Sequence, residues 1–270
     1  RRGGSISAAM NAELAVATAP LVVRLAFDDL SAPDRHARQI AHFLSHPGTV
    51  ACSGAHREIA ANGRATGHLH RPPTDVRSDA FQTPAQEPPL TQPFFMARRA
   101  ALRAVGGYRA LPVSEDSDLY WRLEEIGKLD ILPEVLGSYR MHAGSISSAS
   151  IRHGRRMALW SQLAALSAQR RRSGSPDLAL EGPLWTAGPA DAGLAHLVAA
   201  ASRRFDLSPG ETAWLADAAA AKLMELAGYR PFELQPTDVA FLAERLCRAE
   251  TRTTPLAAMR ACTPGTVVPT

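Results

Sequence analysis

The sequence predicts a mixed α/β part followed by an all-helical part. Up to about residue 150, short β-branched and apolar runs alternate with segments of helical periodicity. Beyond that point alanine, leucine and arginine dominate, and apolar residues recur at helical spacing between Pro and Gly punctuation. We therefore expect two parts, residues 1–150 and residues 151–270.

The chain begins with a predicted helix and a predicted strand. Residues 5–19 have high helix propensity, with a serine near the start as a cap, and Pro20 ends the helix. Residues 21–27 form a compact apolar run that is typical of a buried strand. Asp28 and Asp29 follow at its carboxyl end, where an acid pair is a candidate for a site.

A second helix, a second strand and a long loop are expected next. Residues 31–44 begin with a cap residue and a proline, and residues 49–54 are typical of a short strand. Residues 56–92 are rich in Pro, Gly, Asp, Ser and Thr, so we interpret them as a long surface loop before a cleft-lining block at residues 93–99. The apolar face expected for the second helix consists of Ala37, Ile40, Ala41, Phe43 and Leu44.

An acidic helix start is the most informative stretch of the sequence. A short helix at residues 100–105, ended by Gly106 and Gly107, precedes it. At residues 114–123 a serine and three acids come before apolar residues at helical spacing, which predicts a capped helix with negative charge in its first turn. A further strand is expected at residues 129–136. From this pattern alone, a plain acidic helix cap and a functional site both remain open.

The predicted helical part has clear starts and breaks. Its basic clusters, at residues 152–156 and 170–172, are typical of solvated helix faces or of a surface for an anionic partner. The tail from residue 253 is expected to be frayed. The expected helices are residues 157–171, 192–204, 211–226 and 237–248.

Composition excludes several classes of protein. The formal charge of +4 on 270 residues is modest and gives little support for nucleic-acid binding. Three cysteines, far apart, argue against a disulfide framework or a structural zinc site and fit a reducing cytoplasm. No apolar run is long enough to span a bilayer, although contact with a membrane surface is left open. The sequence starts without methionine, so we expect a fragment or a processed product.

Two acid clusters and two basic side chains downstream form the candidate constellation. Carboxylate oxygens and an imidazole can hold a divalent cation, which would neutralise a phosphate-bearing leaving group. A carboxylate that does not bind the cation could take a proton from an acceptor hydroxyl. The residues are Asp28 and Asp29, then Glu115, Asp116 and Asp118, then Arg140 and His142.

The order of several motifs resembles the later half of a family 2 glycosyltransferase. The resemblance covers about residues 5–147 and implies a GT-A fold, with a Rossmann-like α/β sheet that lacks its first strands. It also implies a nucleotide-diphosphate sugar as donor, a carbohydrate or glycoconjugate as acceptor, and inversion at the anomeric carbon. The motifs are residues 5–11, 24–30, 106–108, 115–123, 133–136, 139–142 and 145–147.

The resemblance also implies roles for individual residues. Asp116 matches the general base of the family's Glu-Asp motif, and Glu115 supports it. Asp28 matches the last acid of the Asp-x-Asp motif, which binds the metal, Mn²⁺ or Mg²⁺, on the donor diphosphate. For His142 a contact with the metal and a hydrogen-bonded loop anchor both stay open.

Arg140 and Asp29 are expected to bind the cofactor, that is, the donor with its divalent metal, and Arg140 would neutralise phosphate charge. Ala26 stands where the family has the first acid of Asp-x-Asp, and the family's opening strands would precede residue 3. Two alternatives therefore accompany the enzyme: a catalytically defective remnant or binding module, and a helical interaction protein with an anionic partner.

Overall fold

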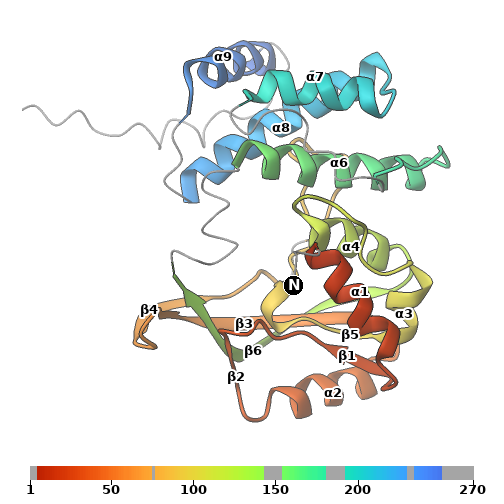
Figure 1. Cartoon of the computed structure of the whole chain (residues 1–270), viewed down its shortest axis with the longest axis vertical. Coiled ribbons are helices and arrows are strands. Elements are labelled where there is room, and N and C mark those ends of the chain that lie inside the picture. Colours follow the sequence, from red (N-terminus) through yellow and green to blue (C-terminus); the bar gives the residue numbers. More distant parts are fainter. Residues whose placement is uncertain (1–4, 75–76, 143–153, 181–191, 230–233, 251–270) are drawn as a thin grey trace, which may run out of the picture.

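The computed structural model describes residues 5–74, 77–142, 154–180, 192–229 and 234–250. A six-stranded sheet lies below a layer of helices, with α2 on its opposite face and the C-terminal helices stacked above (Figure 1). The α/β class and the helical character of the described C-terminal residues are confirmed. The strands are β1 (Leu21–Val23), β2 (Leu30–Ser31), β3 (Thr49–Ala60), β4 (Ala65–His70), β5 (Met96–Arg98) and β6 (Lys128–Met141).

The sheet is mixed. Its order is β1-β5-β3-β6-β2, with β4 paired to β3. β3 and β6 run parallel, whereas the other strand pairs are antiparallel. A short 3-10 turn, η1 (Gln92–Phe94), leads into β5. The helices are α1 (Ile6–Val16), α2 (Arg35–Ser45), α3 (Arg99–Ala104), α4 (Glu115–Glu124), α6 (Gly154–Arg172), α7 (Leu194–Arg204), α8 (Pro209–Tyr229) and α9 (Pro236–Glu250).

Helices with local start and stop signals are confirmed. In α1 the Ser5 hydroxyl accepts a hydrogen bond from the Ala8 amide at 3.2 Å. Gly106 and Gly107 follow α3 with φ angles of 78° and 71°, a left-handed conformation that glycine adopts readily. The predicted C-terminal helices correspond to α6, α7, α8 and α9, although residues 253–270 lie outside the described part.

The expected apolar face of α2 is wrong except at Phe43. Its buried residues are Arg35, Gln39 and Phe43, while Ile40 and Leu44 are exposed. The Arg35 guanidinium donates to Gln39 Oε1 at 2.9 Å and also to main-chain carbonyls of the strand layer. Because these long-range bonds satisfy the buried polar groups, α2 packs through them and not through its aliphatic side chains.

The strand predicted at residues 21–27 is shorter than expected. β1 ends at Val23, and the side chains of Leu25 and Phe27 are exposed. Pairing stops there because β5 begins at Met96, the partner of Val23. Asp28 and Asp29 therefore lie in the turn between β1 and β2, not at the tip of a buried strand.

Residues 56–92 are not the predicted surface loop. β3 continues through residue 60 and forms a hairpin with β4. Farther along, the side chains of Ala80, Ala85 and Leu90 are buried. The residues up to 70 therefore complete the sheet, and residues 78–92 contribute to the core.

Apolar clusters join the sheet layer to the C-terminal helices. One cluster combines Ala80, Ala85 and Trp121 with alanines of α6. The larger one packs α6, α7 and α8 around Trp160 and also includes Leu111. The division at residue 150 stays a prediction. No helix in the described ranges has both the length and the apolar character that a membrane crossing requires.

The predicted basic clusters are largely neutralised within the chain. Residues 152–153 lie outside the described part, but the remaining arginines of α6 mostly face acids. Few of these charges are left for an anionic partner, which argues against the interaction-protein alternative. The pairs are Arg155 with Asp238, Arg170 with Glu211, Arg171 with Glu125 and Asp177, and Arg172 with Glu124.

A methyl group at Gly137 is expected to destabilise the sheet. A Cβ there would lie 2.2 Å from the buried Phe94 ring and 2.3 Å from the Leu30 carbonyl oxygen. Gly137→Ala should therefore lower the free energy of unfolding by about 1–3 kcal/mol, measured by urea denaturation. Gly48→Ala is the matched control, because nothing lies within 4 Å of the added atom. Equal stability changes in the two variants would contradict the packing described for β6.

Candidate active site

α4 begins where the sequence predicts, but without the predicted serine cap. Glu115, Asp116 and Asp118 lie in its first turn. Ser114 has φ 61° and ψ 28°, a left-handed conformation, and its side chain makes no capping hydrogen bond. The position of this turn therefore depends on contacts from other segments.

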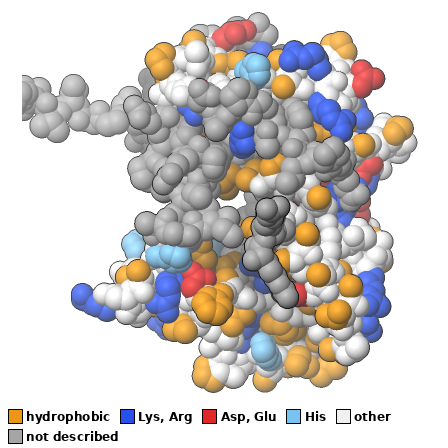
Figure 2. Space-filling model, in the orientation of Figure 1, with side chains coloured by type: hydrophobic (Ala, Val, Ile, Leu, Met, Phe, Trp, Pro, Cys, Tyr) orange, Lys and Arg blue, Asp and Glu red, His pale blue; other side chains and the backbone are white. Residues whose placement is uncertain are grey.

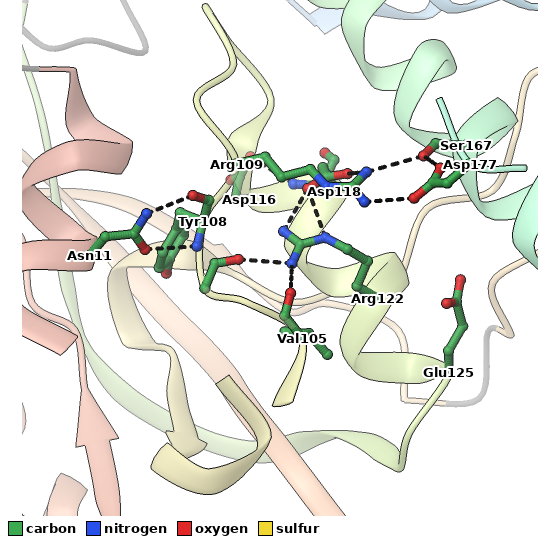
Figure 3. Close-up of polar contacts among 12 residues, drawn as sticks. Asn11, Val105, Tyr108, Arg109, Asp116, Asp118, Arg122, Glu125, Ser167 and Asp177 are labelled. Atoms are coloured by element: carbon green, nitrogen blue, oxygen red, sulfur yellow. Dashed lines mark hydrogen bonds and ion pairs between the residues drawn. The ribbon is translucent and has the colours of Figure 1, made fainter. Parts of the chain in front are cut away.

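A buried ion pair fixes α4 against the turn that precedes it. Asp118 is fully buried, and its Oδ2 accepts hydrogen bonds from Arg122 Nε at 2.9 Å and Nη2 at 2.6 Å. Arg122 Nη1 donates to the carbonyls of Val105 and Gly107 at 2.6 and 2.8 Å. Figure 3 shows the guanidinium between the Asp118 carboxylate and the Val105 carbonyl.

An amide of α1 fixes the other side of the same turn. Asn11 Nδ2 donates to the Tyr108 carbonyl at 2.7 Å, and the Tyr108 amide donates to Asn11 Oδ1 at 2.8 Å (Figure 3). The Tyr108 ring is buried, and its hydroxyl accepts a long hydrogen bond of 3.4 Å from Gln92. Tyr120 of α4 donates to the same Gln92 at 2.7 Å. Tyr108, Gln92 and Tyr120 therefore form a polar group close to the acids of α4.

The two acids at the α4 start hold their protons unusually strongly. Both side chains keep partial exposure, but surrounding protein atoms desolvate the carboxyl groups. Burial, followed by the charge of Asp116, raises the pKa of Glu115 to about 7. Burial likewise raises the pKa of Asp116, against the Ser117 amide, which donates to Asp116 Oδ1 at 2.9 Å. A carboxyl group with a pKa near neutrality is suited to proton transfer.

The structure brings the other four predicted residues together. His142 Nε2 lies 2.6 Å from Asp28 Oδ2, and both side chains are about one-third exposed. The Arg140 amide donates to Asp29 Oδ1 at 2.8 Å, and its guanidinium donates to the Asp28 carbonyl at 2.8 Å. The two aspartates are 111 or more positions away from Arg140 and His142 in the chain, and the four residues form one cluster between the β1–β2 turn and the end of β6.

The two aspartates of this cluster differ in acidity. The hydrogen bond with His142 lowers the pKa of Asp28, which therefore stays ionised. Burial raises the pKa of Asp29, and its Oδ2 atom is buried with no hydrogen-bond partner among the described residues.

Arg24 was missed by the sequence prediction and lies within electrostatic reach of both acid clusters. Burial, the larger cause, raises the pKa of Asp29, Glu115 and Asp116, and the charge of Arg24 opposes that rise at all three. Its Nε atom is buried without a hydrogen-bond partner in the described part of the chain. A lone arginine within an apolar run of the sequence was the signal available.

Main-chain contacts fix the position of Arg24. Its amide donates to the Phe95 carbonyl at 2.9 Å, and its carbonyl accepts from Arg35 Nη2 at 2.8 Å. The buried arginine of α2 therefore holds the chain segment that carries Arg24.

The sequence prediction also missed a group of aromatic and histidine side chains around His56 of β3. His56 is buried, and its ring lies 4.7 Å from His70, 5.4 Å from Phe94 and 5.8 Å from Tyr139. Burial, together with the nearby His70, lowers the pKa of His56 to about 4, so the ring is neutral at physiological pH. Basic, histidine and acidic side chains gather on the side of the molecule where the β3–β4 hairpin lies (Figure 2).

A separate hollow of about 550 Å³ opens at the edge of the sheet. It lies between β2, the start of α2 and β6, and its lining includes Ser31, Arg57 and Ser138. None of the seven candidate residues from the sequence lines it, so we do not assign it to the site.

Comparisons with known proteins find similarity to a glycosyltransferase over part of the chain. No family model matches the chain. The chain is 30% identical over 138 residues to the amylovoran biosynthesis glycosyltransferase AmsE of Erwinia amylovora, which is 51% of this chain and 50% of that protein. The chain therefore spans about half the length of this curated relative. This similarity supports the resemblance to glycosyltransferases, whereas membership of family 2 and the GT-A fold stay predictions.

Two solved structures show a weaker likeness. The mannosyltransferase PcManGT from Pyrobaculum calidifontis, in complex with GDP-Man and Mn²⁺, is 18% identical and matches 83% of this chain and 68% of its own, with a TM-score of 0.40. TarS of S. aureus, residues 1–349, is 13% identical and matches 87% and 75%, with a TM-score of 0.41. Both TM-scores are too low for us to infer anything further from them.

The raised pKa of Glu115 has a consequence for stability. An acid whose pKa is higher in the folded state binds protons preferentially when folded, so stability falls as pH rises from about 4.5 to about 7. Glu115→Gln removes this loss of stability with rising pH. The variant should therefore have a free energy of unfolding higher by about 1–2 kcal/mol at pH 8, with little change at pH 4. Urea denaturation at several pH values measures it.

The control for this prediction is Glu13→Gln, an exposed position on α1. This variant should keep the pH dependence of the parent chain. A parallel pH dependence in Glu115→Gln and the parent would show that Glu115 titrates normally.

Proposed function

We propose that the chain belongs to a glycosyltransferase that moves a sugar from a nucleotide-diphosphate donor to an acceptor hydroxyl, with inversion. Asp116 is the general base and Glu115 supports it. The observation that carries the proposal is that Arg24 acts electrostatically on Asp29 as well as on Glu115 and Asp116, so two acid clusters from distant segments serve one region. The similarity to AmsE supports the same class of reaction.

The proposed chemistry uses the protein's own carboxylates in different ways. Asp116 accepts the proton of the acceptor hydroxyl while that oxygen bonds to the anomeric carbon, and the bond to the donor diphosphate breaks. Glu115, next to it, shares the desolvated environment that keeps both carboxyl groups basic enough for this step. Arg140 adds positive charge near the diphosphate.

The cluster of Asp28, Asp29, Arg140 and His142 offers part of a ligand set for a divalent metal. The described residues contain no group of three or more His, Cys, Asp and Glu side chains arranged to hold a metal ion. Mg²⁺, however, is usually held by one or two carboxylates together with substrate phosphates. Asp28 and His142 would hold the metal, and the neighbouring Asp29 Oδ2 has no hydrogen-bond partner among the residues that the structure describes. When bound, the metal neutralises charge on the leaving diphosphate.

Replacement of the base tests the proposal directly. Asp116→Asn keeps the size of the side chain but cannot accept the proton, so transfer should fall by about 10²–10⁴-fold. Donor affinity, measured by calorimetric titration with nucleotide sugars and Mn²⁺, should stay within about twofold, because Asp116 acts on the acceptor. Asp34→Asn on the exposed start of α2 is the control. Turnover of Asp116→Asn at the parent rate would reject the base assignment.

Metal removal tests the proposed metal-binding role of Asp28 and His142. A chelator should abolish transfer and added Mn²⁺ should restore it. Asp28→Asn should raise the Mn²⁺ concentration for half-maximal activity by about 10-fold or more, because a charged ligand is lost. Full activity in chelator would contradict metal assistance.

A non-catalytic binding module remains the second candidate. It is favoured by Ala26, which stands in place of an acid and uses its carbonyl to accept the Asp29 amide at 3.2 Å. Absence of heat with every nucleotide sugar tested, in the presence of Mn²⁺, would favour this module over the enzyme.

A further inference from the structure

The geometry points to Glu87 as a positioning residue for Asp116, held in place by Lys222 from the helical part of the chain. This inference rests on the proposed function, because it assigns Asp116 a role in proton transfer. It also assigns the C-terminal helices a role in positioning a residue of the site. Glu87 does not belong to any predicted motif.

The contact from the helical part is an ion pair. Lys222 Nζ of α8 lies 3.1 Å from Glu87 Oε1 and 3.3 Å from Glu225 Oε2. Less than one-fifth of the Lys222 and Glu87 side-chain surface is exposed. Burial lowers the pKa of Lys222, but the two carboxylates outweigh that effect and raise it, so the lysine stays charged. A pair that is largely removed from solvent has a defined geometry and is weakly screened by salt.

The other Glu87 oxygen reaches the first turn of α4. Ser117 Oγ donates a short hydrogen bond to Glu87 Oε2, and Ser117 is the residue directly after Asp116. The Ser117 amide in turn donates to Asp116 Oδ1. Side-chain and main-chain contacts therefore run from α8 through Glu87 and Ser117 to the Asp116 carboxylate.

The segment that carries Glu87 is itself fixed on α6. The Ala85 amide donates to Gln162 Oε1 at 2.9 Å, and Gln169 Nε2 donates to the Ala80 carbonyl at 2.5 Å. Gln162 is fully buried, as are Ala80 and Ala85. Glu87 therefore projects from a packed segment between α6 and α4, so a displacement of the C-terminal helices would be transmitted to it.

The first turn of α4 depends on this contact because its own cap is missing. Ser114 supplies no capping hydrogen bond, so the Glu87 carboxylate is an external support for the turn. Its negative charge also raises the pKa of Asp116, after the larger effect of burial. Glu87 thus acts on both the position and the basicity of the carboxylate without contacting substrate.

A second connection from the helical part anchors the same helix farther along. Arg109 Nη1 donates to Asp118 Oδ1 at 3.2 Å and to Ser167 Oγ at 3.2 Å, and its Nη2 donates to Asp177 Oδ2 at 2.6 Å. Figure 3 shows Arg109 spanning the space from α4 to Ser167 and Asp177. Because Arg109 and Arg122 still bind Asp118, the effect of losing the Glu87 contact should be confined to residues 115–117 at the start of the first turn.

Kinetics of matched variants test the assignment. Lys222→Met and Glu87→Ala should lower kcat by about 10- to 100-fold, because small displacements of a catalytic group are costly. KM for the nucleotide sugar should stay within about twofold. Lys222→Arg keeps the charge and should retain at least about half of the parent kcat. Asp217→Asn, which breaks the ion pair of α8 with Arg245, is the control and should leave kcat unchanged.

A Lys222→Met or Glu87→Ala chain that loses activity because the whole chain unfolds does not satisfy the kinetic prediction. The inference is overturned if Lys222→Met and Glu87→Ala turn over at the parent rate. It is also overturned if Lys222→Arg loses as much turnover as Lys222→Met, since the charge would then be irrelevant.

Hydrogen exchange measured by mass spectrometry tests the contact from Lys222 through Glu87 to α4 without an activity assay. In Lys222→Met, amides of the α4 first turn should exchange about 10-fold faster than in the parent, whereas those of β3 and β6 should not change. Glu225→Gln, which removes the other partner of Lys222, should leave the turn unchanged. Unchanged exchange in Lys222→Met overturns the inference. Absence of transfer by the parent with every donor tested would instead defeat the proposed function.

Discussion

The buried ion pair between Asp118 and Arg122 is the interaction on which the candidate site depends. A fully buried carboxylate is tolerated only where cations and hydrogen-bond donors compensate its lost hydration. Asp118 receives three such bonds, two from Arg122 and one from Arg109. The spare donor of Arg122 then binds two carbonyls of the turn at residues 105–107. The pair therefore fixes both the rotation of α4 and the path of the chain that enters it.

This rotation decides which acids of α4 remain available for chemistry. With Asp118 turned inward, Glu115 and Asp116 keep partial access to solvent, beside Tyr108 and within reach of Arg24. Surrounding protein atoms desolvate both carboxyl groups, and no described residue forms an ion pair with either of them. An acidic helix start thus combines one structural carboxylate and two that can exchange protons. Spacing in the sequence alone does not separate these roles.

Local signals in the sequence predicted much of the fold, and long-range contacts account for the errors. Helix limits depend on caps, glycines and periodicity within a few residues, so α1, α3 and the C-terminal helices could be predicted. The buried face of α2 depends on Arg35, whose hydrogen-bond partners lie up to 60 residues away. Likewise, polar composition at residues 56–92 concealed a hairpin and a core segment, because pairing with β3 and packing on α6 override local propensity.

The candidate site shows the same division. Its six predicted residues come from motifs with recognisable order, and the structure places four of them, Asp28, Asp29, Arg140 and His142, in one cluster. Arg24 opens the motif at residues 24–30 but has no role assigned by it, and Glu87 lies in no motif. Their relation to Asp116 arises only when β1, residues 78–92 and α8 pack around α4, so a single sequence could not reveal it.

The pKa of Asp28 is shifted in the opposite direction from those of Glu115 and Asp116, and this contrast favours the proposed roles. Asp28, about one-third exposed and bonded to His142, has a lowered pKa and keeps its charge, as a residue that binds cations requires. At Glu115 and Asp116, burial outweighs the charge of Arg24, so their affinity for protons is raised. Separated pKa values of this kind distinguish a charge-stabilising carboxylate from a proton-accepting one. A purely structural acidic cap would need carboxylates that stay ionised and not carboxylates with a raised affinity for protons, because a helix N-terminus stabilises the ionised form and lowers the pKa.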